Sequence, residues 1–247
     1  MSSFLVKSNQ LASESVSIAA EMHLPLSDLA RLRQGVYRLF GSVLIYPDQE
    51  WMETIPPLAG ALIEETTQLT EFGFWGAWEN LLLSLQSLDD TDRKALEAVY
   101  VKYLMMNDPA EGCAPYESIF IKREDVAWLI GELDGIYAKE GFSLSPSVNQ
   151  MPDHASVQLE FLSALCAREA DAWERESSEE AVMYLRSQIS FLEGHVSRWF
   201  PEFSGRLSRR FEGGFYALAA DSAWLFMAYE MELIRSLIAR YQGEDQG

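Results

Sequence analysis

The chain has 247 residues, 48% of them hydrophobic, and its 19 basic against 38 acidic residues give a formal net charge of −19. The length allows one large domain or two small ones, with enough apolar residues for a sizeable core. The charge argues against nucleic acid and anionic membrane surfaces as partners, because phosphate binding requires clustered Lys and Arg. A basic ligand would be attracted instead, although acidity also serves solubility alone.

The cysteines and the N-terminal segment indicate the cellular compartment of the protein. Cys113 and Cys166, the only two cysteines, form neither a CxxC metal clip nor a disulfide framework, which favours a reducing, cytoplasmic compartment. No apolar run approaches the roughly 20 residues of a membrane span. Residues 1–26 lack the continuous apolar core of a signal peptide, so we expect a loosely ordered arm before a single domain over 27–247.

Apolar residues in the first half recur at spacings of three and four, which predicts helices. The expected helices cover residues 27–46, 56–69, 71–88 and 89–106. Ser27 is the expected cap of the first, and Pro56 and Pro57 are expected to open the second. Trp78 lies in an aromatic-rich helix, where such residues are expected to form core or to line part of a groove.

The second half predicts longer helices around one break. They are expected over residues 123–140, 153–172, 177–200 and 209–241. Gly141 is placed to end the first of these, and the Pro-containing segment 141–152 predicts a hinge-like loop. Ser177 and Glu180 have the capping-box form, and Pro201 is expected to end the third helix. With no convincing strands, the predicted fold is all-α, a compact single-domain bundle of about nine to eleven helices.

No motif of metal or nucleophilic catalysis is present, since HExxH, GxSxG, a Walker loop and GxGxxG are all missing from the sequence. Gln158, four residues after His154, is a poor metal ligand. His195 lies between apolar residues in mid-helix, which is typical of a partly buried structural histidine. Asp153, His154, His195 and a cysteine are residue types that bind metal ions, but their positions have no metal-site spacing signature.

Residues 149–162, NQMPDHASVQLEFL, place a proline, an acid and a histidine at the head of a helix. Asp153 is a preferred N-cap residue, and His154 would then lie on the first turn, within reach of solvent. The turn Pro115–Ser118 raises the same question of whether it is a packed loop or a binding loop. These segments alone leave both interpretations open.

Four segments carry a resemblance to a known family. In chain order they are VYRLFGSVLIYP, then GCAPYESIF, then YAKEGFSLSPSVNQMPDHASVQLEFLSAL, and finally HVSRWFPEF followed by FYALAADSAWLF. Together they resemble the TorD/DmsD/NarJ family of redox-enzyme maturation proteins over about residues 30 to 235. Asn149 and Gln150 stand where many members carry an acid, and the N-terminal arm matches nothing in the family pattern.

The resemblance implies a cytoplasmic, all-helical chaperone that is not an enzyme. Its expected partner is a molybdoenzyme catalytic subunit of the dimethyl-sulfoxide-reductase class, with its twin-arginine signal peptide, held until the cofactor insertion machinery has acted. It implies no cofactor beyond weak guanine-nucleotide binding, and a monomer that can swap halves into a dimer through loop 141–152. The client-binding residues that it implies or that lie in the matching segments are Pro152, Asp153, His154, Tyr116, Glu117, Ser118 and Gln158. Trp78 is added to them as a candidate for the aromatic lining of the groove.

Physical chemistry favours the same interpretation, because a carboxylate such as Asp153 or Glu117 can accept an arginine fork. Two alternatives stay open. MPDHASVQLEFL also resembles the nitrate-reductase branch, whose chaperones assist a membrane-anchored enzyme. An all-α metal-dependent hydrolase using Asp153, His154 and His195 is the alternative from another class.

Overall fold

A computed structural model describes residues 24–70, 73–105, 112–121, 126–144 and 150–244. Its α-helices are α2 (Leu26–Val43), α3 (Gln49–Glu65), α4 (Trp75–Gln86), α5 (Asp90–Val99), α6 (Glu117–Phe120), α7 (Val126–Lys139), α8 (Ala155–Glu174), α9 (Ser178–Phe191), α10 (Ser197–Arg210) and α11 (Phe215–Glu244). A 3₁₀ turn, η1 (Thr66–Leu69), and two π-helical turns, η2 (Tyr100–Leu104) and η3 (Leu192–Val196), complete the described elements. The all-α prediction is confirmed: in the described ranges the only β pairing is an isolated bridge. Most of the predicted arm and the middle of loop 141–152 lie outside those ranges.

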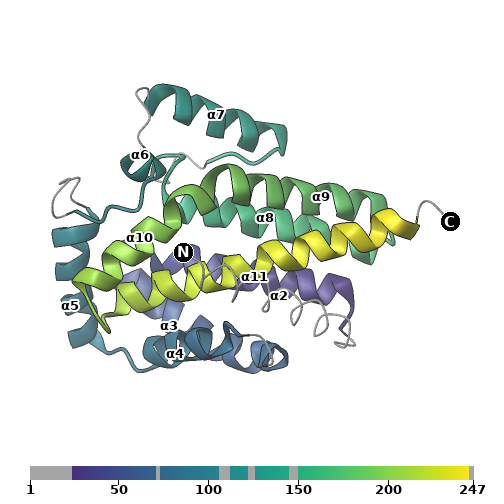
Figure 1. Ribbon diagram of the computed structural model, residues 1–247. Coiled ribbons are helices and arrows are strands. Elements are labelled where there is room, and N and C mark those ends of the chain that lie inside the picture. Colours follow the sequence, from purple (N-terminus) through teal and green to yellow (C-terminus); the bar gives the residue numbers. More distant parts are fainter. Residues whose placement is uncertain (1–23, 71–72, 106–111, 122–125, 145–149, 245–247) are drawn as a thin grey trace, which may run out of the picture.

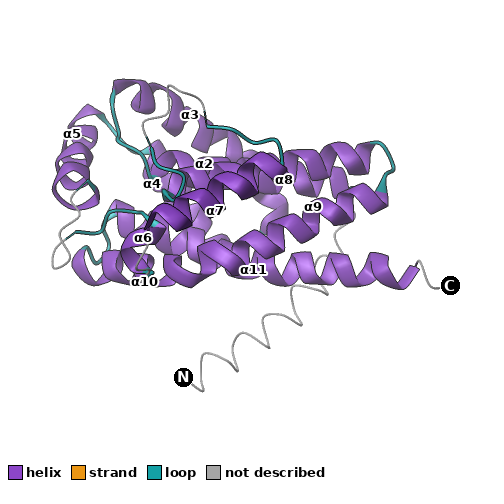
Figure 2. Cartoon of the chain, turned by 90° about the horizontal axis from the view of Figure 1, so that it is seen from above, coloured by secondary structure: helices purple, strands orange, loops and turns teal. Residues whose placement is uncertain are grey.

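Long helices form the centre of the molecule. α2 packs along α8, α8 packs along α9, and α11 contacts α9, α10 and α4 (Figure 1). Shorter helices surround this centre, with α7 lying across α8 and α9 in both views (Figures 1 and 2). α2 meets the start of α8 closely, because a Cβ on Gly41 would lie 3.2 Å from the backbone oxygen of Ser156. The segment that precedes α8 is thereby fixed against the core.

Several predicted helix starts are wrong, because caps and packing decide them. α2 begins at Leu26 after Pro25, without a side-chain cap, so Ser27 is not its cap. Asp48 caps α3 by accepting a bond from the backbone N–H of Trp51 at 2.8 Å, and Pro56 and Pro57 lie inside that helix. The early cap and the burial of Trp51 start the helix two turns before the prolines.

Of the other predicted helix boundaries, one is confirmed and two are wrong. Gly141 follows α7 with a φ of 63°, which confirms its predicted role. Pro201 does not end its helix but lies within α10, and α11 begins at Phe215 after Gly213, whose φ is 73°. Ser177 precedes α9 but makes no side-chain capping bond, so the predicted capping box does not form.

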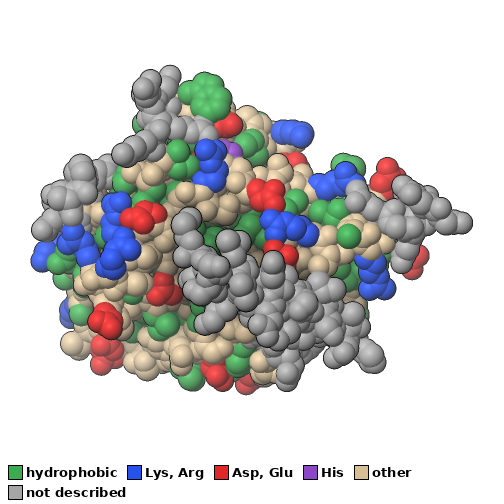
Figure 3. Space-filling view, viewed as in Figure 1, with side chains coloured by type: hydrophobic (Ala, Val, Ile, Leu, Met, Phe, Trp, Pro, Cys, Tyr) green, Lys and Arg blue, Asp and Glu red, His purple; other side chains and the backbone are tan. Residues whose placement is uncertain are grey.

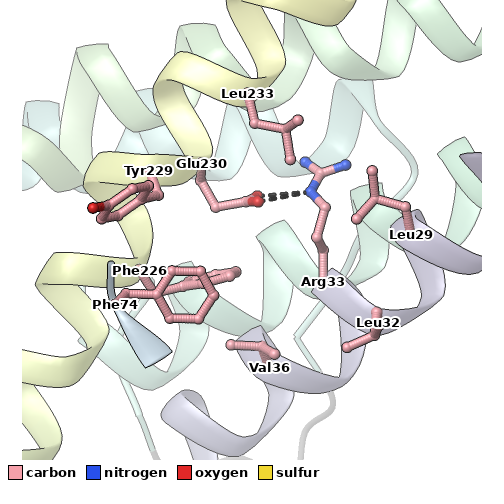
Figure 4. Close-up of a pocket in the computed structure, with 9 residues that line it drawn as sticks. All are labelled: Leu29, Leu32, Arg33, Val36, Phe74, Phe226, Tyr229, Glu230 and Leu233. Atoms are coloured by element: carbon pink, nitrogen blue, oxygen red, sulfur yellow. Dashed lines mark hydrogen bonds and ion pairs between the residues drawn. The ribbon is translucent and has the colours of Figure 1, made fainter. Parts of the chain in front are cut away.

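A buried ionic cluster joins four of the long helices. Arg33 of α2 bonds Glu230 of α11 at 2.8 Å (Figure 4). It also bonds Glu169 of α8 at 2.7 Å. Its remaining guanidinium nitrogen donates to Gln188 of α9, which in turn donates to Glu169. Burial acts to lower the pKa of Arg33, but the two carboxylates outweigh it and hold that pKa well above its ordinary value. An adjacent cavity of about 20 Å³ is too small for anything larger than a water.

Candidate functional site

The two loops singled out in the sequence lie side by side. The N–H of Glu117 donates to the carbonyl of Asp153 at 3.0 Å, and the N–H of Ala155 donates to the carbonyl of Pro115 at 2.8 Å. Between these bonds Tyr116 and His154 form an isolated antiparallel bridge. Residues far apart in the chain are therefore held together by backbone pairing, which orients their side chains.

Asp153 does not cap α8, contrary to the prediction. Its Oδ2 instead accepts a bond at 3.1 Å from the N–H of Ser118, in the first turn of α6. His154 is the N-cap of α8, where Nδ1 accepts from the N–H of Ser156 at 3.1 Å. The backbone pairing turns Asp153 toward α6, so the next residue takes over the capping of α8.

The expectation that His154 lies within reach of solvent is wrong, and Asp153 is buried beside it. Asp153 is 2% exposed and His154 is 1% exposed. The hydroxyl of Tyr137 in α7 donates to the carbonyl of the buried Pro152 at 2.8 Å. The ring of Tyr116 packs edge-on against His154 at 4.8 Å between ring centroids. The loop is therefore an interior support in this conformation.

The buried histidine predicts a pH dependence of stability. Burial lowers the pKa of His154 to about 3, from 6.5. As the pH falls through 6.5, the unfolded chain takes up a proton at His154 that the folded chain does not. The contribution of this residue to the free energy of unfolding is therefore fully present above pH 6.5 and decreases as the pH falls toward 3. We expect about 2 kcal/mol less unfolding free energy at pH 5 than at pH 7 from this residue. His154→Asn, which keeps a capping oxygen, should flatten that difference in urea titrations; equal slopes in both proteins would contradict this.

A second buried network extends from Glu117, which is fully buried. Its Oε2 accepts a bond from Nε2 of Gln158 at 2.6 Å and lies 3.1 Å from Nδ1 of His195. Nε1 of Trp199 donates to Oε1 of Gln158 at 3.0 Å. The network therefore links α6, α8, η3 and α10. Trp78 belongs elsewhere: it is buried in the core, where it donates to Thr66.

A groove of about 590 Å³ opens beside this network, between α7 on one side and α9, η3 and α10 on the other. The lining residues are Glu132, Ile136, Lys139, Glu140, Phe161, Arg186, Ser187, Ser190, Phe191, Gly194, His195 and Arg198. His195, predicted as a structural residue, is buried and forms part of this lining, with Nδ1 turned to Glu117. The groove and the motif loops are thus joined through a single histidine.

This groove was not predicted from the sequence. Arg186 and Arg198 resemble ordinary solvent-facing positions of a helix, and nothing local shows that α7 lies opposite them. One signal was available: Arg186, Ser190, Gly194 and Arg198 recur every four residues, with small residues between two arginines. Such a stripe leaves space along a helix face.

Two kinds of feature are absent from the described ranges. No helix in those ranges is long and apolar enough to cross a membrane. The part of the chain that the structure describes also holds no group of three or more His, Cys, Asp and Glu side chains arranged for a metal ion.

Comparison with known proteins places these features in context. A family model described as "Nitrate reductase delta subunit" matches residues 69–204. The chain is 29% identical over 136 residues to the perchlorate reductase assembly chaperone protein of Dechloromonas aromatica (strain RCB), covering 55% of this chain and 60% of that protein. It is 29% identical over 117 residues to chaperone protein TorD of Vibrio vulnificus (strain YJ016), covering 46% and 52% respectively. It is 31% identical over 136 residues to the selenate reductase assembly chaperone protein of Thauera selenatis, covering 53% and 67%.

Proposed function

The chain belongs to the nitrate reductase delta subunit family, and from that premise we propose that it is an assembly chaperone for the catalytic subunit of a molybdoenzyme. The three relatives described above are named as chaperones or assembly chaperones and none as an enzyme, which favours this role over the hydrolase alternative. The observation that carries the proposal is the groove between α7 and the α9–α10 helices.

The groove has the size and chemistry of a binding site for a segment of polypeptide. Its volume of about 590 Å³ lies within the range of about 300–1,000 Å³ that ligand sites occupy. Ile136, Phe161 and Phe191 offer apolar contact, while Glu132 and Glu140 present carboxylates. An apolar client side chain and a basic one can therefore be held together in this groove.

The residues of the two motif loops then have a supporting role. Glu117 and Asp153 are buried and bonded to neighbours inside the protein, so an incoming arginine would meet a carboxylate of the groove lining, such as that of Glu140, instead. Glu117 with Gln158 fixes His195 at the groove, while Pro152, Asp153 and His154 hold the adjoining loop. Tyr116 and Ser118 belong to the same loop pairing.

The proposed client segment is the N-terminal twin-arginine signal of a dimethyl-sulfoxide-reductase-class subunit, bound in the cytoplasm until the cofactor is inserted. A second candidate is favoured by the description of the matching family model. In that case the client is a membrane-anchored, nitrate-reductase-type subunit, recognised through its mature apoprotein. Titration calorimetry distinguishes the two, with signal peptides, their Lys-Lys variants and apo catalytic subunits as titrants.

Blocking the groove should abolish client binding. A Cβ at Gly194 meets nothing within 4 Å, so Gly194→Phe places a ring in the groove without disturbing the core. We expect at least about tenfold weaker binding of the apo client, corresponding to about 1.4 kcal/mol. Gly76→Phe is the matched control, because Gly76 in α4 is equally unobstructed and does not line the groove. Undiminished binding by the Gly194 variant would place the client elsewhere.

A further inference from the structure

Two arginines of the groove form no ion pair with a carboxylate in the described ranges. Arg186 and Arg198 are exposed, and no carboxylate of the described residues forms an ion pair with either one; Arg198 donates only to the carbonyl of Gly194, one turn before it. Lys139 on the opposite side is also exposed and unpaired within these ranges. Most other arginines of the described chain do pair with acids, as Arg31, Arg33, Arg93, Arg175, Arg206, Arg209 and Arg235 show.

This local charge runs against the net charge of −19. The acidic excess is not spread evenly: Figure 3 shows Lys and Arg side chains gathered on one side of the visible face, over α5 and α10. The overall charge therefore does not tell what the groove prefers, and the expectation of a purely basic ligand does not follow from it.

The π-helical turn η3 brings the two arginines onto one wall. In a regular α-helix, residues twelve apart differ by about 120° around the axis, so Arg186 and Arg198 would face different directions. η3 lies between them as one wider turn, and both line the groove together with Ser190 and Gly194. At 1.5 Å per residue, their backbones stand about 18 Å apart.

The other charged groups at the groove do not cancel this pair. Glu132 and Glu140 come from the α7 side, and Oε1 of Glu140 accepts a bond from the hydroxyl of Ser187 at 2.8 Å. Arg168 donates to the backbone carbonyl of Glu140 and so fixes the end of α7. Nδ1 of His195 lies within hydrogen-bond distance of the buried Glu117 carboxylate, at 3.1 Å. The groove thus has two arginines on the α9–α10 side, and Glu132, Lys139 and Glu140 on the α7 side.

We propose that the groove selects a client segment that carries two carboxylates four to six residues apart in an extended conformation, one for each arginine. An extended chain advances about 3.3 Å per residue, so this spacing spans about 13–20 Å and matches the arginine pair. Arginine and carboxylate form paired, charge-assisted hydrogen bonds. This inference rests on the proposed function in its second form, in which the groove recognises a segment of the mature apoprotein, because it names the chemistry of that segment.

The test uses fluorescein-labelled twelve-residue peptides of Ala, Ser and Leu with two glutamates placed two, four, six or eight residues apart. Fluorescence anisotropy with the full chain should show the tightest binding at spacings of four and six. Binding should be at least about fivefold weaker at two and eight, and with Gln in place of Glu. Arg186→Gln and Arg198→Gln should each remove this preference. Arg38→Gln, an exposed arginine of α2 that does not line the groove, should leave it unchanged.

Equal binding at all spacings, displacement by inorganic phosphate at the same concentration as by peptide, or unchanged binding by both arginine variants would each overturn the inference. The proposed function is judged separately. If the apo client binds, is blocked by Gly194→Phe and is indifferent to Arg186→Gln and Arg198→Gln, the chaperone role stands and the carboxylate preference falls. If the acidic peptides bind with the predicted spacing and no apo client binds, the preference stands and the chaperone role falls.

Discussion

Replacing Arg33 by methionine is expected to lower the free energy of unfolding by about 3–5 kcal/mol. Arg33 is 3% exposed and is the only cation bonded to Glu169 and Glu230 in the described part of the chain. Without it, two carboxylates remain buried next to each other with no opposite charge. Burial already raises the pKa of Glu230, and Arg33 is what counters that rise. Urea denaturation at pH 7 measures the loss.

A matched control stands two residues away. Arg31 bonds Asp171 and Glu174 at the surface and is 40% exposed. Arg31→Met should change the free energy of unfolding by no more than about 1 kcal/mol, because exposed ion pairs contribute little. Adding Glu230→Gln to Arg33→Met should restore part of the lost stability by removing one uncompensated charge. Similar losses for the Arg31 and Arg33 variants would contradict a special role for the buried cluster.

The second large effect is expected at Glu117. Glu117→Ala should destabilise the protein by about 2–4 kcal/mol, because Gln158 and His195 each lose a buried hydrogen-bond partner. His195 lines the groove, so client binding should weaken together with stability. Urea denaturation and calorimetric titration of the apo client measure the two losses on the same samples.

Two further variants identify the origin of this effect. Glu117→Gln keeps one accepting oxygen and should fall between the wild type and the alanine variant. Glu160→Ala removes an exposed carboxylate from α8 and should stay within about 0.5 kcal/mol of the wild type. If Glu117→Ala lost stability but bound the client normally, His195 would be a structural residue without influence on the groove.

The helical class of the fold was predictable because apolar spacing is a local property. The segment around Val36 and Phe40 shows its period of three and four directly in the sequence, and both residues are buried. Helix starts were less predictable, because the deciding cap can be a residue outside the periodic run. Asp48 starts α3 ahead of two prolines that on their own suggested a later start.

The sequence indicated which residues lie together in the candidate site, but it did not indicate that their side chains point into the protein. The sequence drew attention to Glu117, Asp153, His154 and Gln158, and all four lie in the same pair of linked networks. Their burial follows from backbone pairing between loops about 40 residues apart, which no local pattern contains. The groove depended in addition on the π-helical turn η3, which changes the facing of every residue after it.

The Arg33 cluster also governs the order in which the protein can fold. Arg33 lies 136 residues before Glu169 and 197 residues before Glu230. During synthesis, α2 therefore emerges with a charge whose last carboxylate partner follows 197 residues later. Contacts of such long sequence separation form slowly, because a long loop must close before they contribute. Completion of the core is thus expected to be a late folding step, and a chain cut short before α11 would leave Arg33 with only part of its buried partners.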